Sequence, residues 1–163
     1  MLHKLMEDEL KELNIRKTSS GQIIQGATHT VKILNHKHRQ ATIDHAIKVL
    51  SKYKFDGIAC SGVSGLMLVP QLCEKLDKNI IVVRKIKETR YSPFDYEGVP
   101  PKKYIIVDDL VSSGNTVQRI LELFKEEIPS AKCVGYYSYL SNECSYTSAP
   151  LVFNKVFGID YLV

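Results

Sequence analysis

The sequence contains no apolar run close to the ~20 residues that a membrane-spanning helix needs. Its amino terminus turns acidic where a signal peptide would be apolar, so no export signal is visible and we expect a cytoplasmic protein. The four cysteines show no C-x-x-C spacing, which argues against a zinc site and favours reduced thiols packed as small apolar groups. Internal repeats, low-complexity tracts and linkers are also absent. These absences argue against a membrane span, an exported disulfide scaffold and a zinc protein.

The length and composition of the chain fit one globular domain. Its 163 residues are enough for a single domain of ordinary size, which we expect to span residues 1–163. Hydrophobic residues make up 44% and charged residues 25%, as in soluble globular proteins. The formal net charge of +4 is a mild excess. It suits a small anionic substrate and falls short of the bias of a dedicated nucleic-acid binder, so we do not expect nucleic acid as a partner.

Helix-like and strand-like segments alternate from residue 39 onward. Apolar residues at helical spacing predict helices over three segments: 39–53, 66–76 with Pro70 at a kink or in the first turn, and 117–128. Short apolar runs predict strands over five segments: 55–60, 79–84, 104–107, 133–140 and 156–163. Strands that are apolar on both faces belong to parallel sheets covered by helices on each side. The pattern predicts an α/β domain with a mainly parallel central sheet flanked by helices.

One long segment, residues 85–103, has three prolines, a glycine and no clear period. Loops of this length inside a compact domain are uncommon and are often lids or binding loops. We therefore predict that residues 86–103 form a mobile lid; the alternative is a mobile surface hairpin without function.

Residues 104–116 are the most informative part of the sequence. An apolar strand ends in two adjacent carboxylates, Asp108 and Asp109, and a small-residue loop then leads into a helix. Ligands of parallel sheets bind at the carboxyl ends of strands, and a helix amino terminus favours a phosphate. Adjacent carboxylates suit a ligand that also has hydroxyls or a magnesium ion, as a sugar phosphate does. The loop is neither a Walker loop nor a dinucleotide fingerprint, and on spacing alone it could also be a solvated acidic turn before a capped helix.

Residues 104–116 resemble the 5-phosphoribosyl-1-pyrophosphate (PRPP) motif of the type I phosphoribosyltransferases. That motif has four apolar residues, two acids, two variable residues and a Ser/Thr-Ser/Thr-Gly-x-Thr loop. Asn115 stands where a second glycine is common, and the resemblance extends over most of residues 39–128. It implies the fold of that family, with a core of about 39–140 and a small hood. It also implies that the 5-phosphate binds to one loop: Ser112, Ser113, Gly114, Asn115 and Thr116.

The resemblance implies roles for further residues. Asp108 and Asp109 would be catalytic, accepting the ribose hydroxyls directly or through Mg²⁺. Lys85 would neutralise the leaving pyrophosphate, which would bind at the ends of two strands: Ser61, Gly62, Arg84 and Lys85. The implied reaction transfers the 5-phosphoribosyl group from PRPP to a nucleobase and releases pyrophosphate, in purine or pyrimidine salvage. The family further implies a homodimer in which a basic residue of one subunit helps the site of the other.

The identity of the base stays open. In the family a hood outside the core recognises the base, and here the hood would come from the segment before residue 39, the tail after residue 140, or both. The tail is similar to the end of the 6-oxopurine enzymes, which makes Phe157 and Asp160 candidate base-binding residues. Phe157 is equally consistent with a plain core aromatic.

The pattern of the 6-oxopurine enzymes is only partly present. Gly135 occupies the position where those enzymes keep a lysine, and Tyr91 and Ser92 stand in reversed order. Lys87 or Arg90 could supply the positive charge that orotate needs. The alternative function is a regulator of the same fold that binds PRPP or a nucleotide without turnover. The intact acid pair and Lys85 favour an enzyme over that alternative.

Overall fold

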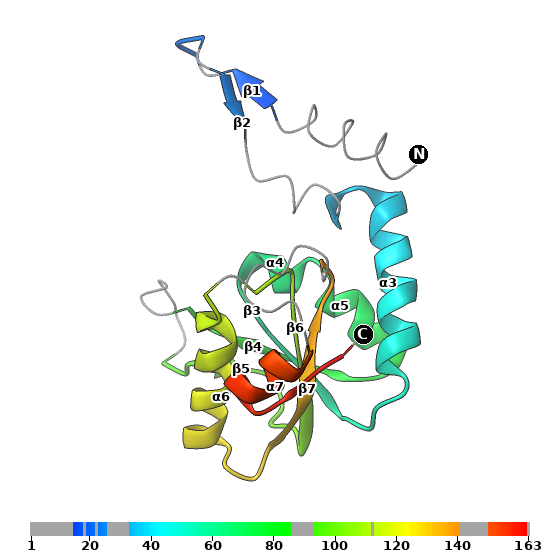
Figure 1. Ribbon diagram of the computed structural model, residues 1–163, viewed down its shortest axis with the longest axis vertical. Helices are drawn as coiled ribbons and strands as arrows, with labels where there is room; N and C mark the ends of the chain where they lie inside the picture. The colour runs from blue at the N-terminus through cyan, green and yellow to red at the C-terminus, as the bar shows by residue number, and fades with distance from the viewer. Residues whose placement is uncertain are drawn as a thin grey trace.

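The computed structural model describes residues 15–17, 19–21, 23–25, 33–85, 93–111, 113–140 and 150–162. Its centre is a six-stranded sheet with the order β5-β4-β3-β6-β7-β8 (Figure 1). The strands are β3 (Gly57–Ser61), β4 (Asn79–Val83), β5 (Tyr96–Glu97), β6 (Lys103–Asp108), β7 (Lys132–Ser138) and β8 (Asp160–Tyr161). Neighbouring strands are parallel except for β4 and β5. Near the amino terminus, β1 (Ile15–Lys17) and β2 (Ile23–Gln25) form a separate antiparallel pair.

Helices cover both faces of the sheet. On one face, α3 (His36–Leu50) and α5 (Val69–Leu76) pack against strand residues that include Ile105 and Val107. On the other face, α6 (Asn115–Glu127) packs against strand residues that include Tyr104 and Ile106. Residues 104–107 of β6 therefore alternate between the two cores, which is why all four are apolar. The predicted α/β class with a mainly parallel sheet is confirmed.

Two segments differ from the sequence prediction. The segment predicted as a helix over 66–76 divides into α4 (Gly62–Leu66) and α5, with Pro70 in the first turn of α5 as anticipated. The strand predicted over 156–163 is wrong in its first part, because α7 (Pro150–Phe157) extends to Phe157. Gly158 ends this helix with a φ of +67° and donates a backbone hydrogen bond to Asn154 at 2.7 Å. A short apolar run does not distinguish a buried strand from a helix.

Part of the predicted lid belongs to the sheet. Residues 86–92 lie outside the described residues. In the described remainder, β5 pairs antiparallel with β4, so this part of the segment is a strand at the edge of the sheet. Gly98 has a φ of +120° and lies so close to β4 that a Cβ at this position would be 2.2 Å from the Ile80 carbonyl oxygen. The lid prediction is therefore restricted to residues 86–92.

None of the helices in the described ranges is both long and apolar enough to cross a membrane. The carboxyl ends of β3, β4 and β6 lie together at one edge of the sheet, where polar side chains gather.

Candidate functional site

A pocket of about 270 Å³ opens at the carboxyl ends of the central strands. It is formed by the residues that follow β3, β4 and β6. Most of the residues predicted to bind PRPP line it together: Ser61, Lys85, Asp108, Asp109, Ser113, Gly114, Asn115 and Thr116. Parallel strands bring residues far apart in the sequence to one edge of the sheet, and this places the acids, the lysine and the loop around one cavity.

Asp108 is the last residue of β6 and is only 6% exposed. Burial, followed by the negative charge of Asp109, raises the pKa of Asp108 to about 7. The Ser64 hydroxyl donates to Asp108 Oδ1 at 3.1 Å, and the Asp109 amide donates to the same oxygen at 2.9 Å. These two hydrogen bonds favour the charged form without overcoming burial. A cation or further hydroxyl donors in the pocket would complete the stabilisation of this carboxylate.

Backbone hydrogen bonds hold the acid pair in place. The Tyr139 amide donates to the Asp108 carbonyl at 3.2 Å, and the Leu140 amide donates to the Asp109 carbonyl at 3.0 Å. The Tyr139 hydroxyl also donates to the Ser64 carbonyl at 3.0 Å, which ties α4 to the end of β7. The backbone of Asp108 and Asp109 is therefore held by the segment after β7, and the Asp108 carboxylate is held by Ser64 of α4.

Gly62 and Lys85 lie in direct contact on the other side of the pocket. Gly62 follows β3 with a φ of +68°, a conformation that L-residues with a Cβ rarely adopt. A Cβ at this position would lie 2.6 Å from Lys85 Cε and 2.9 Å from Lys85 Nζ. The lysine ammonium therefore occupies the space that the absent side chain leaves. The Lys85 ammonium, which lines the pocket, is suited to an anion, whereas Gly62 itself is not among the lining residues.

Arg84 makes different contacts from its neighbour Lys85. Its guanidinium pairs with Glu97 on β5, and its backbone amide donates to the Asp95 carbonyl at 2.8 Å. Arg119 Nε donates to the Arg84 carbonyl at 3.2 Å, while the Arg119 guanidinium lies 3.5 Å from the Asp95 carboxylate. The structure thus brings Lys85 into the pocket and places Arg84 in a network that joins α6 to the β4–β5 connection.

The loop before α6 completes the pocket. Ser113, Gly114, Asn115 and Thr116 line it, whereas Ser112 lies outside the described residues. Gly114 is the cap residue of α6 and has a φ of +79°. Because a glycine offers no side-chain oxygen to the amides of the first helical turn, those amides can serve an anionic ligand.

The family model of the phosphoribosyl transferase domain matches residues 29–148, which is most of the chain. The chain belongs to this family. Its structure is similar to that of orotate phosphoribosyltransferase from Aeropyrum pernix, with a TM-score of 0.68 and 15% identity over 99% of this chain and 91% of that one. At this identity the likeness shows the fold alone, and it confirms the type I phosphoribosyltransferase architecture.

Two kinds of curated relative share this phosphoribosyl transferase domain. An adenine phosphoribosyltransferase from Fervidobacterium nodosum is 28% identical over 122 residues, which cover 65% of this chain and 71% of the relative. The transcriptional regulator GfcR from Methanococcus vannielii is 28% identical over 85 residues, which cover 47% of this chain and 42% of the relative. The chain therefore spans less than half the length of that regulator.

The two candidate base-binding residues lie away from the pocket of this phosphoribosyl transferase domain. Phe157 ends α7 and packs against the core on the α6 face. Asp160 begins β8, which runs parallel to β7 at the sheet edge, and lines a second pocket near the amino ends of the strands. At Gly135, a Cβ would be 2.7 Å from the Asp160 carbonyl oxygen and 2.8 Å from Leu162 Cδ2. The absence of a lysine at this position follows from the close packing of β8 on β7.

Three residues that support the site were not assigned from the sequence. Ser64 lies on α4, and its hydroxyl contacts Asp108. Tyr139 follows β7 and Arg119 lies on α6, and neither stands in a recognisable motif. Their contacts join elements that are distant in the chain, so no local pattern marks them.

Proposed function

We propose that the protein transfers the 5-phosphoribosyl group of PRPP to a nucleobase and releases pyrophosphate. The supporting observation is that one pocket brings together the acid pair, Lys85 and the loop before α6. These three groups suit the three parts of PRPP. Carboxylates accept hydrogen bonds from ribose hydroxyls, the loop amides suit the 5-phosphate, and the ammonium suits the pyrophosphate.

The proposed mechanism is electrostatic. The bond between C1 of the ribose and the pyrophosphate oxygen breaks as a bond from C1 to a nitrogen of the base forms. Positive charge develops on the ribose ring, and the fixed charges of Asp108 and Asp109 would stabilise it. Negative charge develops on the leaving pyrophosphate, and Lys85 would stabilise that charge. The base nitrogen is itself the nucleophile, so the chain needs none of its own. The proton on that nitrogen passes to solvent, so no general base is needed either.

The acid pair also fits a magnesium ion that is shared with the substrate. Mg²⁺ is commonly held by one or two carboxylates together with phosphate oxygens. Among the described residues, no group of three or more His, Cys, Asp and Glu side chains could hold a metal ion. Two adjacent carboxylates, one of them buried with a raised pKa, would be stabilised by a divalent cation. Asp108 and Asp109 would hold the ion, which would supply further positive charge for the pyrophosphate.

The test is a pyrophosphate-release assay with PRPP, magnesium and a panel of bases. The panel should contain adenine, hypoxanthine, guanine and orotate, because relatives of the chain are named for adenine and for orotate. We expect turnover with at least one purine or pyrimidine base. Absence of turnover with every base, at protein concentrations where PRPP binds, would contradict an enzymatic function.

The second candidate is a regulator that binds PRPP or a nucleotide without turnover. The similarity to a transcriptional regulator, 28% identical over 85 residues, favours it. The complete set of charged groups in the pocket favours the enzyme, because a protein that only binds has no need of charges placed for the transition state. Binding of PRPP without turnover would support the regulator.

PRPP with magnesium should stabilise the folded protein. A ligand at 100 times its Kd contributes about 2.7 kcal/mol to the unfolding free energy, which for a domain of this size raises Tm by roughly 5–10 °C. Differential scanning fluorimetry measures this rise. Ribose 5-phosphate and pyrophosphate, added separately, are the controls and should each give a smaller rise, since each would engage only part of the pocket. No change in Tm at millimolar PRPP would contradict a PRPP site.

Substituting Gly62 should impair the proposed activity through Lys85. Gly62→Ala adds a Cβ within 2.6 Å of Lys85 Cε, so the ammonium must move. We expect a fall in kcat/KM for PRPP on the order of tenfold or more, alongside roughly 1 kcal/mol of strain from the positive φ. Gly158→Ala is the matched control, because its φ of +67° is similar and nothing lies within 4 Å of the added Cβ. The prediction is wrong if both variants lose the same fraction of activity.

The proposal also covers the oligomeric state of the protein and its location in the cell. We propose a cytoplasmic homodimer in which a basic residue near the end of β4 contributes to the site of the other subunit. Support comes from membership of the phosphoribosyl transferase family and from the exposed position of Lys85 directly before residues 86–92.

A further inference from the structure

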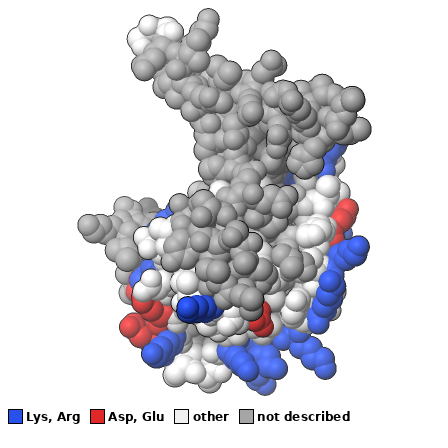
Figure 2. All heavy atoms as spheres, in the orientation of Figure 1, with Lys and Arg blue, Asp and Glu red and all other residues white. Residues whose placement is uncertain are grey.

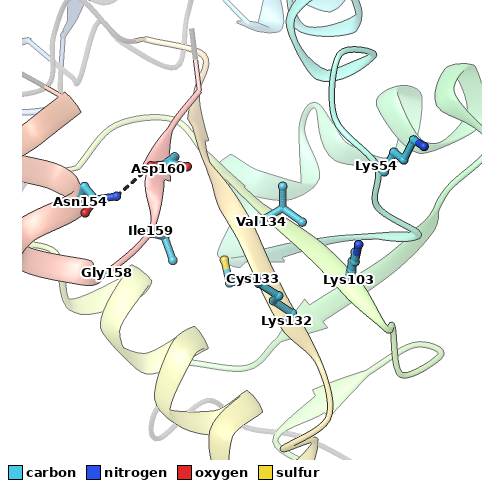
Figure 3. A pocket seen from close by; sticks show the side chains of 9 residues that line it. All are labelled: Lys54, Lys103, Lys132, Cys133, Val134, Asn154, Gly158, Ile159 and Asp160. Atoms are coloured by element: carbon cyan, nitrogen blue, oxygen red, sulfur yellow. Dashed lines mark hydrogen bonds between the residues drawn. The ribbon is translucent and has the colours of Figure 1, made fainter.

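A second pocket, of about 410 Å³, lies near the amino ends of β6 and β7 (Figure 3). It shares no lining residue with the pocket at the carboxyl ends. Strand β6 connects the two sites, with Lys103 at its first position and Asp108 at its last. The residues that determine the chemistry of the second pocket are Lys54, Lys103, Lys132, Cys133, Ile159 and Asp160.

Three lysines give this pocket an excess of positive charge. Lys54 comes from the connection between α3 and β3, Lys103 begins β6, and Lys132 begins β7. All three are exposed, and within the described ranges none forms an ion pair with a carboxylate. Figure 2 shows Lys and Arg gathered along the lower edge of the molecule, toward which the amino ends of these strands point in Figure 1.

The neighbouring carboxylates are already engaged in hydrogen bonds. Asp160 accepts a hydrogen bond from Asn154 Nδ2 at 2.8 Å, as Figure 3 shows. Asp56 accepts hydrogen bonds from the backbone amides of Lys102 and Lys103 at 2.9 and 2.8 Å. Because both carboxylates are held by hydrogen bonds to other groups of the protein, the lysine ammonium groups remain available to an external anion.

Part of the remaining lining is apolar. Cys133 and Ile159 contribute apolar side chains on the α6 face, and Val134 contributes one on the α3 face (Figure 3). Small-molecule sites typically have volumes of about 300–1,000 Å³ and combine apolar walls with a few charged groups. An inorganic anion would leave most of this pocket and its apolar wall unused. A molecule with a phosphate and a less polar part would use both.

We propose that this pocket binds a phosphate-bearing small molecule of the size of a nucleotide. The phosphate lies among the three ammonium groups, and the less polar part lies against Cys133 and Ile159, which belong to the same face of the sheet. This binding is separate from the proposed reaction and does not depend on it.

The direct test is a titration of ¹⁵N-labelled protein with AMP in the absence of magnesium, followed by NMR. We expect amide shifts at Cys133, Val134 and Ile159 that saturate with their own dissociation constant. Any shifts around Asp108 and Gly114 should follow a different binding curve. Inorganic phosphate should bind the same amides more weakly than AMP, and adenosine should leave them unchanged. Shifts confined to the carboxyl-end pocket, or an equal response to adenosine, would overturn the proposal.

Charge-matched variants distinguish a site from general electrostatic attraction. Lys103→Gln/Lys132→Gln and the control Lys48→Gln/Lys125→Gln each remove two exposed lysines, so both lower the net charge equally. We expect AMP binding at the amino-end pocket to weaken at least tenfold in the first variant and less than twofold in the control. Equal weakening in both variants would overturn the proposal.

An oligonucleotide provides the remaining comparison. A single-stranded oligonucleotide should not shift these amides at lower concentrations than AMP does. If it does so, the lysines form a nucleic-acid surface and the small-molecule proposal is wrong.

Discussion

Replacing both Asp108 and Asp109 with Asn should lower kcat/KM for PRPP by a factor on the order of 10³ or more. Removal of one fixed electrostatic contact in an active site commonly costs a factor of about 10²–10³, and here two carboxylates would lose their charge. The same double variant should lose most of the rise in Tm that PRPP and magnesium produce. Pyrophosphate release and scanning fluorimetry measure the two effects.

The matched control for this variant is Asp44→Asn/Asp77→Asn. It removes the same two negative charges from exposed positions on α3 and after α5. Activity and the response to PRPP should stay close to those of the parent protein. An unchanged response to PRPP in Asp108→Asn/Asp109→Asn would overturn the assignment of the acid pair.

Asp108→Asn should lower activity. Without ligand, the variant should be at least as stable as the parent protein at high pH. Burial and the charge of Asp109 raise the pKa of Asp108 from 3.8 to about 7 in the folded state. Between these pH values the folded state binds more protons than the unfolded state, so the unfolding free energy contributed by this group falls as pH rises. The variant lacks this titration. Its Tm, measured by calorimetry from pH 5 to 8, should fall less with pH than that of the parent and should match or exceed it at pH 8.

Lys85→Ala should lower turnover about a hundredfold, which corresponds to roughly 3 kcal/mol of transition-state stabilisation. The reason is that Lys85 places its ammonium against Gly62 in the pocket, where the pyrophosphate charge would develop. Steady-state kinetics with PRPP measure the effect. Lys48→Ala, on the exposed face of α3, is the control and should have no effect on the rate.

Mixed subunits test whether Lys85 acts within its own chain or across a dimer. Lys85→Ala and Asp108→Asn/Asp109→Asn should each keep only a small residual activity, about a hundredth and a thousandth of the parent rate. Mixtures that exchange subunits should rise above the residual activity of either variant if each site draws the lysine from one chain and the acids from the other. A monomer by light scattering, or no recovery in mixtures shown to exchange, would contradict the proposed shared site.

The sequence by itself determined the fold class and identified most of the residues that line the candidate pocket. Continuous β-branched runs such as residues 80–83 and 105–107 indicated strands buried on both faces, and the structure places them at the centre of a parallel sheet. Asp108, Asp109 and the loop before α6 are contiguous in the chain. Their roles follow from local rules about strand ends and helix starts, which hold before any tertiary contact is known.

Only the tertiary structure decided which neighbouring side chains share the pocket. Arg84 and Lys85 are adjacent and both basic, but Lys85 lies against Gly62 while Arg84 pairs with Glu97. Successive side chains of an extended segment point in opposite directions, so the sequence could not assign each one a side until the sheet and its neighbours were in place. Ser64 likewise reaches Asp108 from a different element.

The secondary structure of the carboxyl-terminal segment also depended on contacts between distant parts of the chain. Its apolar residues suit a helix and a strand equally well over so short a length, and the choice depends on what they pack against. In the folded protein α7 covers the α6 face, and β8 then joins the sheet beside Gly135. This arrangement carries Asp160 to the amino ends of the strands, away from Asp108. Local sequence thus determined the strand ends and the phosphate loop, whereas contacts between distant segments decided where the tail lies.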